Sequence, residues 1–247
     1  MGKIVAIGGG TYDKNILIHK KIVALTGKPN PKALYIPTAS GENENNINKF
    51  KKVYGEKLKC QTDVLYLLKI IPSIKQLSEK ILSADLIYVG GGNTLMMMKR
   101  WRFLGVDKLL KTAYQKGIVL SGISAGSICW FESGHSDSMS FYHPNNWNYI
   151  NVHGIGLIKG IHCPHFNGET MGIKRKSNFS NFMKKHSAMG IAIDNHCAIA
   201  FIDDKFKVIS LKKDSHAYRV YREKDKVYNI QIPEGKNYIP VSSLYMI

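Results

Sequence analysis

The chain has 247 residues, and its shares of hydrophobic residues (44%) and charged residues (21%) are those of a globular protein with a buried core, which excludes disordered and fibrous classes. Its 35 lysines and arginines exceed its 18 aspartates and glutamates by 17, a balance that can attract nucleic acid. The lysines lie in scattered pairs, such as Lys20-Lys21 and Lys184-Lys185, without a basic stripe interleaved with aromatic residues. We therefore expect a lysine-rich surface and no nucleic-acid partner.

Short apolar runs alternate with longer amphipathic runs through the first half of the chain, which predicts alternating strands and helices. In chain order, the predicted strands are 3–7, 33–37, 62–67, 86–89 and 117–121. The predicted helices are 15–26, 45–58, 74–83, 94–101 and 106–115. This alternation indicates βαβ units, and hence a three-layer α/β fold with a mostly parallel sheet and helices on both faces.

The pattern changes after about residue 187, where short strands follow one another between turn residues. These predicted strands are 190–193, 198–201, 207–210, 217–221 and 227–230. They indicate C-terminal antiparallel strands that extend one edge of the sheet. No linker, repeat or low-complexity tract divides the chain, so we expect a single domain over residues 1–247.

The sharpest motif is the segment 122–126, Gly-Ile-Ser-Ala-Gly, which matches the pattern G-x-S-x-G. It follows the predicted strand 117–121 and precedes an apolar stretch, 128–131, that is expected to open a helix. In such a turn the glycines allow close backbone contacts, Ser124 is lifted out of the sheet as a nucleophile, and the amide of Ala125 faces the reacting carbonyl. The plainer alternative is a glycine turn with a helix-capping serine.

A serine hydroxyl becomes a good nucleophile only beside a base that is itself oriented by a third group. The candidate bases are His135, His162 and His165. The candidate acids are Glu132, Asp137 and Asp194. The residues alone do not choose among them, because a single histidine is more often structural and a carboxylate often serves a helix end or a turn.

A second glycine run, 90–92, ends a predicted strand and is followed by Asn93. It lacks the spacing of a nucleotide-binding loop, so a phosphate cradle is poorly supported. The other interpretations are a second oxyanion donor at the carboxyl ends of the strands, or a tight turn with Asn93 as the helix N-cap. The first glycine run, 8–10, is equally ambiguous.

Four features of the chain, taken in this order, resemble peptidase E. They are Val-Gly-Gly-Gly-Asn-Thr at 89–94, Gly-Ile-Ser-Ala-Gly at 122–126, an aspartate soon afterwards, and Cys-Pro-His-Phe at 163–166. This family of aspartyl dipeptidases also includes cyanophycinase, and the resemblance extends from Gly8 to about Ile202. It implies a fold related to the class I glutamine amidotransferases. Those relatives carry cysteine at the turn where this chain has Ser124, which favours the peptidase branch.

The resemblance also implies roles for the matching residues. Ser124 corresponds to the nucleophile, His165 to the general base, and the amides of Gly92 and Ala125 to the oxyanion hole. Asp137 matches the third member of the triad best, with Glu132 as the alternative. The implied reaction is acyl transfer through an acyl-enzyme, without a metal or a cofactor.

One departure from the family concerns the arginine that its aspartyl dipeptidases tend to carry after the Pro-His-Phe match, where it suits a substrate carboxylate. Lys174, Arg175 and Lys176 lie in that segment, and none of them aligns clearly. We therefore expect a dipeptidase-like serine peptidase, with cleavage after aspartate as one specificity. The alternatives are an ester or amide hydrolase with the same site, and a basic binding protein with an inactive site.

The cysteines also limit the possibilities: Cys60, Cys129, Cys163 and Cys197 are far apart, which signals neither a zinc site nor a disulfide scaffold. The start of the chain lacks the pattern of a signal peptide, and no apolar run approaches the roughly 20 residues of a membrane span. We expect a cytoplasmic protein that acts on a small peptide, without a membrane partner. A homodimer is compatible with this expectation.

Overall fold

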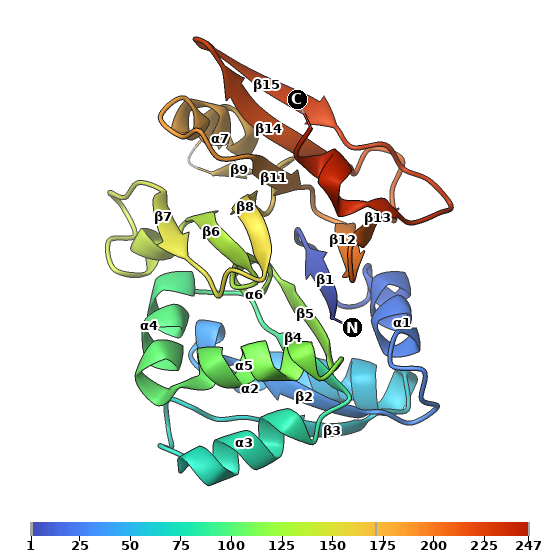
Figure 1. Cartoon of the computed structure of the whole chain (residues 1–247). Coiled ribbons are helices and arrows are strands. Elements are labelled where there is room, and N and C mark those ends of the chain that lie inside the picture. Colours follow the sequence, from blue (N-terminus) through green and yellow to red (C-terminus); the bar gives the residue numbers. More distant parts are fainter. Residues whose placement is uncertain (1, 171, 247) are drawn as a thin grey trace.

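The computed structural model describes residues 2–170 and 172–246, and its largest element is an eight-stranded sheet in the order β16-β13-β12-β1-β5-β4-β2-β3 (Figure 1). The parallel part comprises β1 (Lys3–Ile7), β2 (Lys32–Ile36), β3 (Gln61–Val64), β4 (Leu86–Val89) and β5 (Val119–Ile123). Three antiparallel strands complete one edge: β12 (Cys197–Ile202), β13 (Lys205–Ser210) and β16 (Ile239–Pro240).

Helices cover both faces of this sheet, because each strand turns alternate side chains to opposite faces. One face packs against α3 (Ile74–Leu82), α4 (Thr94–Leu104) and α5 (Val106–Gln115), and the other against α1 (Ile16–Ala24), α2 (Glu44–Phe50) and the π-helix η2 (Lys51–Lys57). In β1, Ile4 and Ala6 belong to the first core, and Val5 and Ile7 to the second. The predicted three-layer α/β fold is confirmed.

A second, six-stranded sheet stands beside the first, in the upper part of Figure 1, in the order β15-β14-β11-β8-β6-β7. Its strands are β6 (Phe131–Ser136), β7 (Ile150–His153), β8 (Ile158–Cys163), β11 (Gly190–Ile193), β14 (Ala217–Glu223) and β15 (Lys226–Gln231). Helix α7 (Arg175–Met183) packs on it and follows the small ribbon of β9 (Glu169–Thr170) and β10 (Ile173–Lys174). Short turns are η1 (Thr38–Ser40), α6 (Ala125–Ile128), η3 (Ser138–Phe141) and η4 (Val241–Leu244).

The C-terminal strands depart from the prediction of one extended edge, because they divide between the two sheets. β12 and β13 extend the main sheet, whereas β14 and β15 join the second sheet through β11. β11 pairs in parallel with β8, so the chain crosses from one sheet to the other between β11 and β12. This crossing carries residues 194–196 to the carboxyl end of β1, where Gly9 forms a bridge with Asn195.

The helices of the described part of the chain are short: the longest, α4, has 11 residues, and none is long and apolar enough to cross a membrane. The prediction of one domain over residues 1–247 stays a prediction.

Candidate active site

Ser124 occupies a strained turn at the carboxyl end of β5, between that strand and α6. Its φ is 56° and its ψ is −117°, values that a residue with a side chain rarely adopts. A Cβ added to Gly122 would lie 2.1 Å from the carbonyl oxygen of Gly126, and one added to Gly126 would lie 2.2 Å from that of Val89. The flanking glycines therefore permit the turn, and the predicted strand–turn–helix setting is confirmed.

The helix after this turn is shorter than expected. α6 ends at Ile128, and the apolar residues that follow lead into β6, which begins at Phe131. Trp130 and Phe131 are fully buried, so this apolar stretch serves the core between the two sheets rather than a long helix.

His165 lies against Ser124, with 2.8 Å between its Nε2 and the serine Oγ. It follows β8 and Pro164, has a positive φ of 54°, and donates its backbone amide to the carbonyl oxygen of Gly8 at 3.1 Å. Burial lowers the pKa of its imidazole below the usual value, although the hydrogen bond to Asn195 works in the opposite direction. The ring is therefore neutral at pH 7 and available as a base.

The other ring nitrogen of His165 contacts an amide: its Nδ1 lies 2.7 Å from Oδ1 of Asn195. Asn195 is held in turn by Asn167, whose Oδ1 accepts from the backbone amide and from Nδ2 of Asn195, each at 2.9 Å. A backbone amide can only donate, so the Asn167 atom is an oxygen and the Asn195 atom facing it is the NH₂ group. Oδ1 of Asn195 then faces His165.

This arrangement fixes the tautomer of His165, because an amide oxygen accepts only from a protonated nitrogen. Nδ1 carries the proton, and Nε2 has a free lone pair that accepts the hydroxyl hydrogen of Ser124. The serine, histidine and asparagine thus form a continuous hydrogen-bonded chain with the polarity that nucleophilic catalysis requires.

The structure gives His165 a different partner from the predicted carboxylate. In the part of the chain that the structure describes, neither Asp137 nor Glu132 forms a hydrogen bond with its ring. Asp137 precedes η3 at its N-cap position, beyond the end of β6, and acts on the ring only as a nearby negative charge. Glu132 is exposed and accepts the amide of Gly160 at 2.7 Å. Both follow Ser124 closely in sequence, but they lie in or just after β6, and among the described residues neither forms a hydrogen bond with Nδ1 of His165.

Gly9 explains the first glycine run, which the sequence left ambiguous. A Cβ at this position would lie 2.1 Å from Oδ1 of Asn195 and 2.3 Å from Nδ1 of His165. The carbonyl oxygen of Gly9 also accepts the amide of His196 at 3.0 Å. Gly9 therefore leaves room for the hydrogen bond that orients the imidazole.

The second glycine run packs against the serine. A Cβ at Gly91 would lie 3.2 Å from Cβ of Ser124, whereas Gly92 has a φ of 137° and packs against the carbonyl oxygen of Ala39. Within residues 2–170 and 172–246, no hydrogen bond uses the amides of Gly91 and Gly92, and Ala125 is the first residue of α6, where helix amides are free. Three free amides thus lie in the segments around Ser124.

Asn93 has the capping role that was one of the interpretations of this run. Its Oδ1 accepts the amide of Met96 at 3.0 Å and closes the first turn of α4. The same loop therefore places Gly91 against Ser124 and starts a helix.

The other candidate residues have structural partners. His162 is fully buried, and its ring contacts Oγ of Ser127 and the carbonyl oxygen of Ile191, each at 2.8 Å. His135 contacts Oδ1 of Asn178 at 3.1 Å. Burial lowers the pKa of His162 to about 3 and that of His135 to about 2. Asp194, whose pKa burial raises, accepts the amide of His216 at 2.9 Å.

A cavity of about 540 Å³ opens beside Ser124 and His165, at the carboxyl ends of β1, β4 and β5, where open α/β sheets bind ligands. Its floor includes the aromatic rings of Tyr12, Tyr35 and Tyr88, and one wall carries Asn46, Lys49 and Lys52. Among the described residues, no group of three or more His, Cys, Asp or Glu side chains is arranged to hold a metal ion.

Arg175 differs in burial from its two basic neighbours, in the segment where the family tends to carry an arginine. Lys174 and Lys176 are exposed, whereas Arg175 is only 4% exposed. Its guanidinium lies 3.9 Å from the ring centre of Tyr149, and Nη2 donates to the carbonyl oxygen of His135. Its Nε lacks a partner within the described residues, which leaves one buried donor of this cation unused.

Comparisons with known proteins identify a family for this chain. The model of peptidase family S51 matches residues 4–209. An uncharacterized peptidase of Bacillus subtilis (strain 168), YgaJ, is 32% identical over 237 residues, which cover 94% of this chain and 98% of the relative.

Two solved structures share the fold. A peptidase from an acI-B1 actinobacterium covers 97% of each chain with a TM-score of 0.72 and 21% identity. A putative peptidase E protein from Listeria monocytogenes EGD-e covers 86% of this chain and 100% of its own, with a TM-score of 0.66 and 19% identity.

Proposed function

The chain belongs to peptidase family S51, and from this membership and the geometry at Ser124 we propose that it is a serine peptidase which cleaves short peptides through an acyl-enzyme. The observation that carries the proposal is the 2.8 Å contact between Oγ of Ser124 and Nε2 of His165, made from a strained turn. Backbone strain at a nucleophile persists only where the surrounding structure maintains it.

In the proposed reaction, Oγ of Ser124 attacks the peptide carbonyl carbon while Nε2 of His165 takes the hydroxyl proton. The carbonyl oxygen becomes an oxyanion, which the amides of Ala125 and of Gly91 or Gly92 stabilise. The carbon–nitrogen bond then breaks, and His165 returns the proton to the leaving amine. Water attacks the resulting ester by the same route and regenerates the serine.

Asn195 has a positioning role in this mechanism. It holds the proton on Nδ1 and fixes the plane of the ring, as a triad carboxylate does. Being neutral, it does not offset the charge that His165 acquires in the transition state. Asp137 supplies a negative charge nearby, which raises the pKa of His165 and partly compensates.

Cleavage after aspartate is the finer part of the proposal, and Arg175 supports it. Of the three basic residues in its segment, Arg175 is the buried one. Its positive charge contributes to the lowered pKa of His165. A guanidinium with an unused donor suits a carboxylate.

A dipeptide library tests the function, with hydrolysis followed for the wild type and for Ser124→Ala. We expect the wild type to cleave a subset of the library, with acidic residues enriched on the acyl side, and the variant to cleave none. Equally poor hydrolysis by both proteins would rule out the proposed peptidase activity. Cleavage without any preference for acidic residues would remove only the role of Arg175.

A further inference from the structure

One wall of the cavity beside Ser124 is a single helical segment with two lysines on the same face. Lys49 lies in the last turn of α2, and Lys52 lies three residues later in η2, so their side chains project from neighbouring positions. Both line the cavity together with Asn46 and Val53 of the same segment. We call Asn46, Lys49 and Lys52 the lysine wall.

Lys49 and Lys52 differ from three other lysines in the first third of the chain, which form ion pairs. Lys57 pairs with Asp13 at 2.8 Å, Lys69 with Glu44 at 3.3 Å, and Lys80 with Asp63 at 2.9 Å. In residues 2–170 and 172–246, neither Lys49 nor Lys52 lies within 4.0 Å of a carboxylate oxygen.

The carboxylate that lines the cavity, that of Asp13, forms an ion pair with Lys57. Asp13 is the one acidic residue among the described residues that line it, and its pKa is lowered chiefly by the hydrogen bond from Lys57. The charges of Lys52 and Lys49 lower this pKa further, but the ion pair of Asp13, at 2.8 Å, is with Lys57.

The floor of the cavity adds no negative charge. Burial raises the pKa of Tyr35 to about 12 and raises those of Tyr12 and Tyr88 well above the usual value. These hydroxyl groups stay protonated at pH 7, so the cavity next to the nucleophile has an excess of positive charge.

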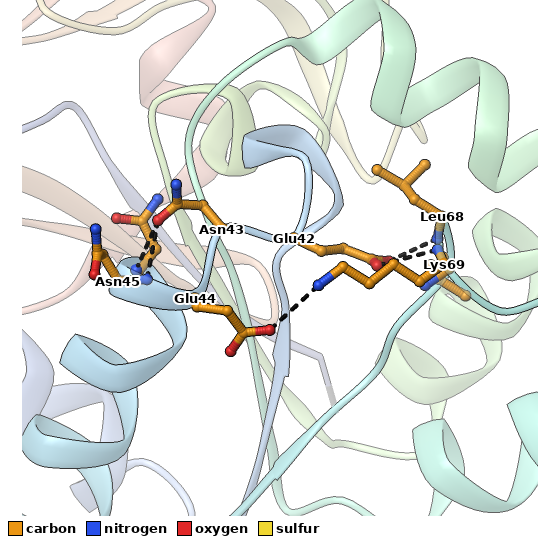
Figure 2. Close-up of polar contacts among 8 residues, drawn as sticks. Glu42, Asn43, Glu44, Asn45, Leu68 and Lys69 are labelled. Atoms are coloured by element: carbon orange, nitrogen blue, oxygen red, sulfur yellow. Dashed lines mark hydrogen bonds and ion pairs between the residues drawn. The ribbon is translucent and has the colours of Figure 1, made fainter.

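Glu42 and Asn43 hold the start of α2, the helix that carries the first part of the lysine wall, and Figure 2 shows their hydrogen bonds. Glu42, which is 1% exposed and has a φ of 59°, accepts the backbone amides of Leu67, of Leu68 at 2.6 Å and of Lys69 at 3.2 Å. Asn43 then caps α2 by accepting the amides of Asn45 at 3.0 Å and Asn46 at 3.3 Å.

The π-helical turns fix the other end of the wall. The predicted helix 45–58 is α-helical only to Phe50, and the wider η2 follows. In this geometry Phe50 and Tyr54 stack at 4.6 Å and are fully buried, while Lys52 faces the cavity. The helical backbone is thus held at both ends, and the side chains of Lys49 and Lys52 line the same cavity.

We propose that Lys49 and Lys52 bind a carboxylate of the substrate and so determine which peptides are held for attack by Ser124. This inference rests on the proposed function and extends it with a specificity site that is separate from Arg175. The volume of the cavity suits a small peptide. Two unpaired ammonium groups favour an anionic ligand, and the carboxylate is either the C-terminal group of the peptide or an acidic side chain.

The test uses two fluorophosphonates that react with the active serine, one with a neutral alkyl chain and one whose chain ends in a carboxylate. The measured quantity is the ratio of their labelling rates at Ser124. For the wild type we expect the carboxylate probe to react faster, and in Lys49→Gln/Lys52→Gln we expect the ratio to fall by about tenfold. Lys51→Gln removes an adjacent exposed charge outside the cavity and should keep the ratio.

The outcomes separate the two proposals. Labelling by the neutral probe with an equal ratio in wild type and double variant overturns the carboxylate site and leaves the peptidase proposal standing. The absence of labelling by either probe, together with no hydrolysis in the dipeptide library, overturns both. For cleaved dipeptides, a comparison with their C-terminal amides identifies the source: loss of cleavage on amidation assigns the α-carboxylate, and retention assigns the side chain.

Discussion

The reacting groups and the lysine wall lie on the same cavity but are built in opposite ways. Ser124, His165 and Asn195 come from three distant segments, are joined by contacts of 2.7 and 2.8 Å, and are packed against glycine backbone. Lys49 and Lys52 come from one short segment and are exposed. The proposed chemistry therefore depends on close packing of the reacting groups. The proposed specificity depends on the charge of two exposed side chains, and small displacements of these side chains should matter less.

The largest expected effect comes from removing the nucleophile. Ser124→Ala should lower kcat/KM for a cleaved dipeptide by about 10⁴-fold or more, because the remaining groups only bind the substrate and polarise its carbonyl. Thermal denaturation serves as the control for folding. A variant that folds and retains measurable peptidase activity would contradict the role of Ser124.

The packing of the reacting groups is tested by a single methyl group. Gly9→Ala places a Cβ where Asn195 and His165 meet, so the imidazole has to move, and a displacement of this kind costs about 100-fold in kcat. Gly235→Ala is the matched control, since nothing lies within 4 Å of that position. Equal kcat values for the two variants would show that the Asn195–His165 contact does not matter.

The chemical identity of residue 195 should appear in the pH dependence of kcat/KM. The wild-type base has a lowered pKa, so activity should persist below pH 6.5, the ordinary pKa of histidine, and be lost at lower pH as His165 is protonated. Asn195→Asp places a negative charge at Nδ1, favours the imidazolium and moves this acid limb to higher pH. An unmoved limb would mean that residue 195 does not contact the ring during the reaction.

The anchor of the lysine wall should affect binding more than chemistry. Glu42→Gln leaves one of three backbone amides without its carboxylate acceptor, at a cost of about 1–3 kcal/mol in the free energy of unfolding. Because the start of α2 loosens, KM should rise while kcat stays close to that of the wild type. Glu44→Gln, which removes an exposed ion pair with Lys69, is the control. A fall in kcat with an unchanged KM would show that Glu42 acts on the chemical step and not on substrate binding.

The smallest expected effect is that of salt. Exposed lysines are screened as ionic strength rises, so KM for a carboxylate-bearing peptide should increase severalfold between low and high salt, with kcat nearly constant. In Lys49→Gln/Lys52→Gln the dependence should disappear. Salt dependence that persists in the double variant would assign the attraction to the overall positive charge of the chain instead.

The features of the site that depend on neighbouring residues in the sequence could be predicted from the sequence alone. The turn at Ser124 could be predicted because a strand leads into a serine flanked by two glycines, and the alternation of strands and helices indicated the three-layer sheet. The family resemblance selected His165 among the histidines, and its contact with Ser124 agrees. His162, only three residues away, points into the core instead.

Asn195 was missed because its position depends on the crossing between the two sheets. An asparagine in a turn after a short strand is an ordinary turn residue, and only the pairing of β11 with β8 and the bridge to Gly9 bring it to His165. The first glycine run was the available signal, since three glycines directly after a strand indicate close backbone contact. Expecting a carboxylate directed attention to Asp137 and Glu132.

The proposed activity depends on the hydrogen-bonded chain of Asn195, His165 and Ser124, which should make this serine reactive. Labelling with the neutral fluorophosphonate, followed by mass spectrometry of the digested protein, tests it most directly in the wild type, His165→Ala and Asn195→Ala. We expect an adduct on Ser124 in the wild type, none in His165→Ala, and slower formation in Asn195→Ala. An adduct on another residue, or equal labelling rates in all three proteins, would contradict it.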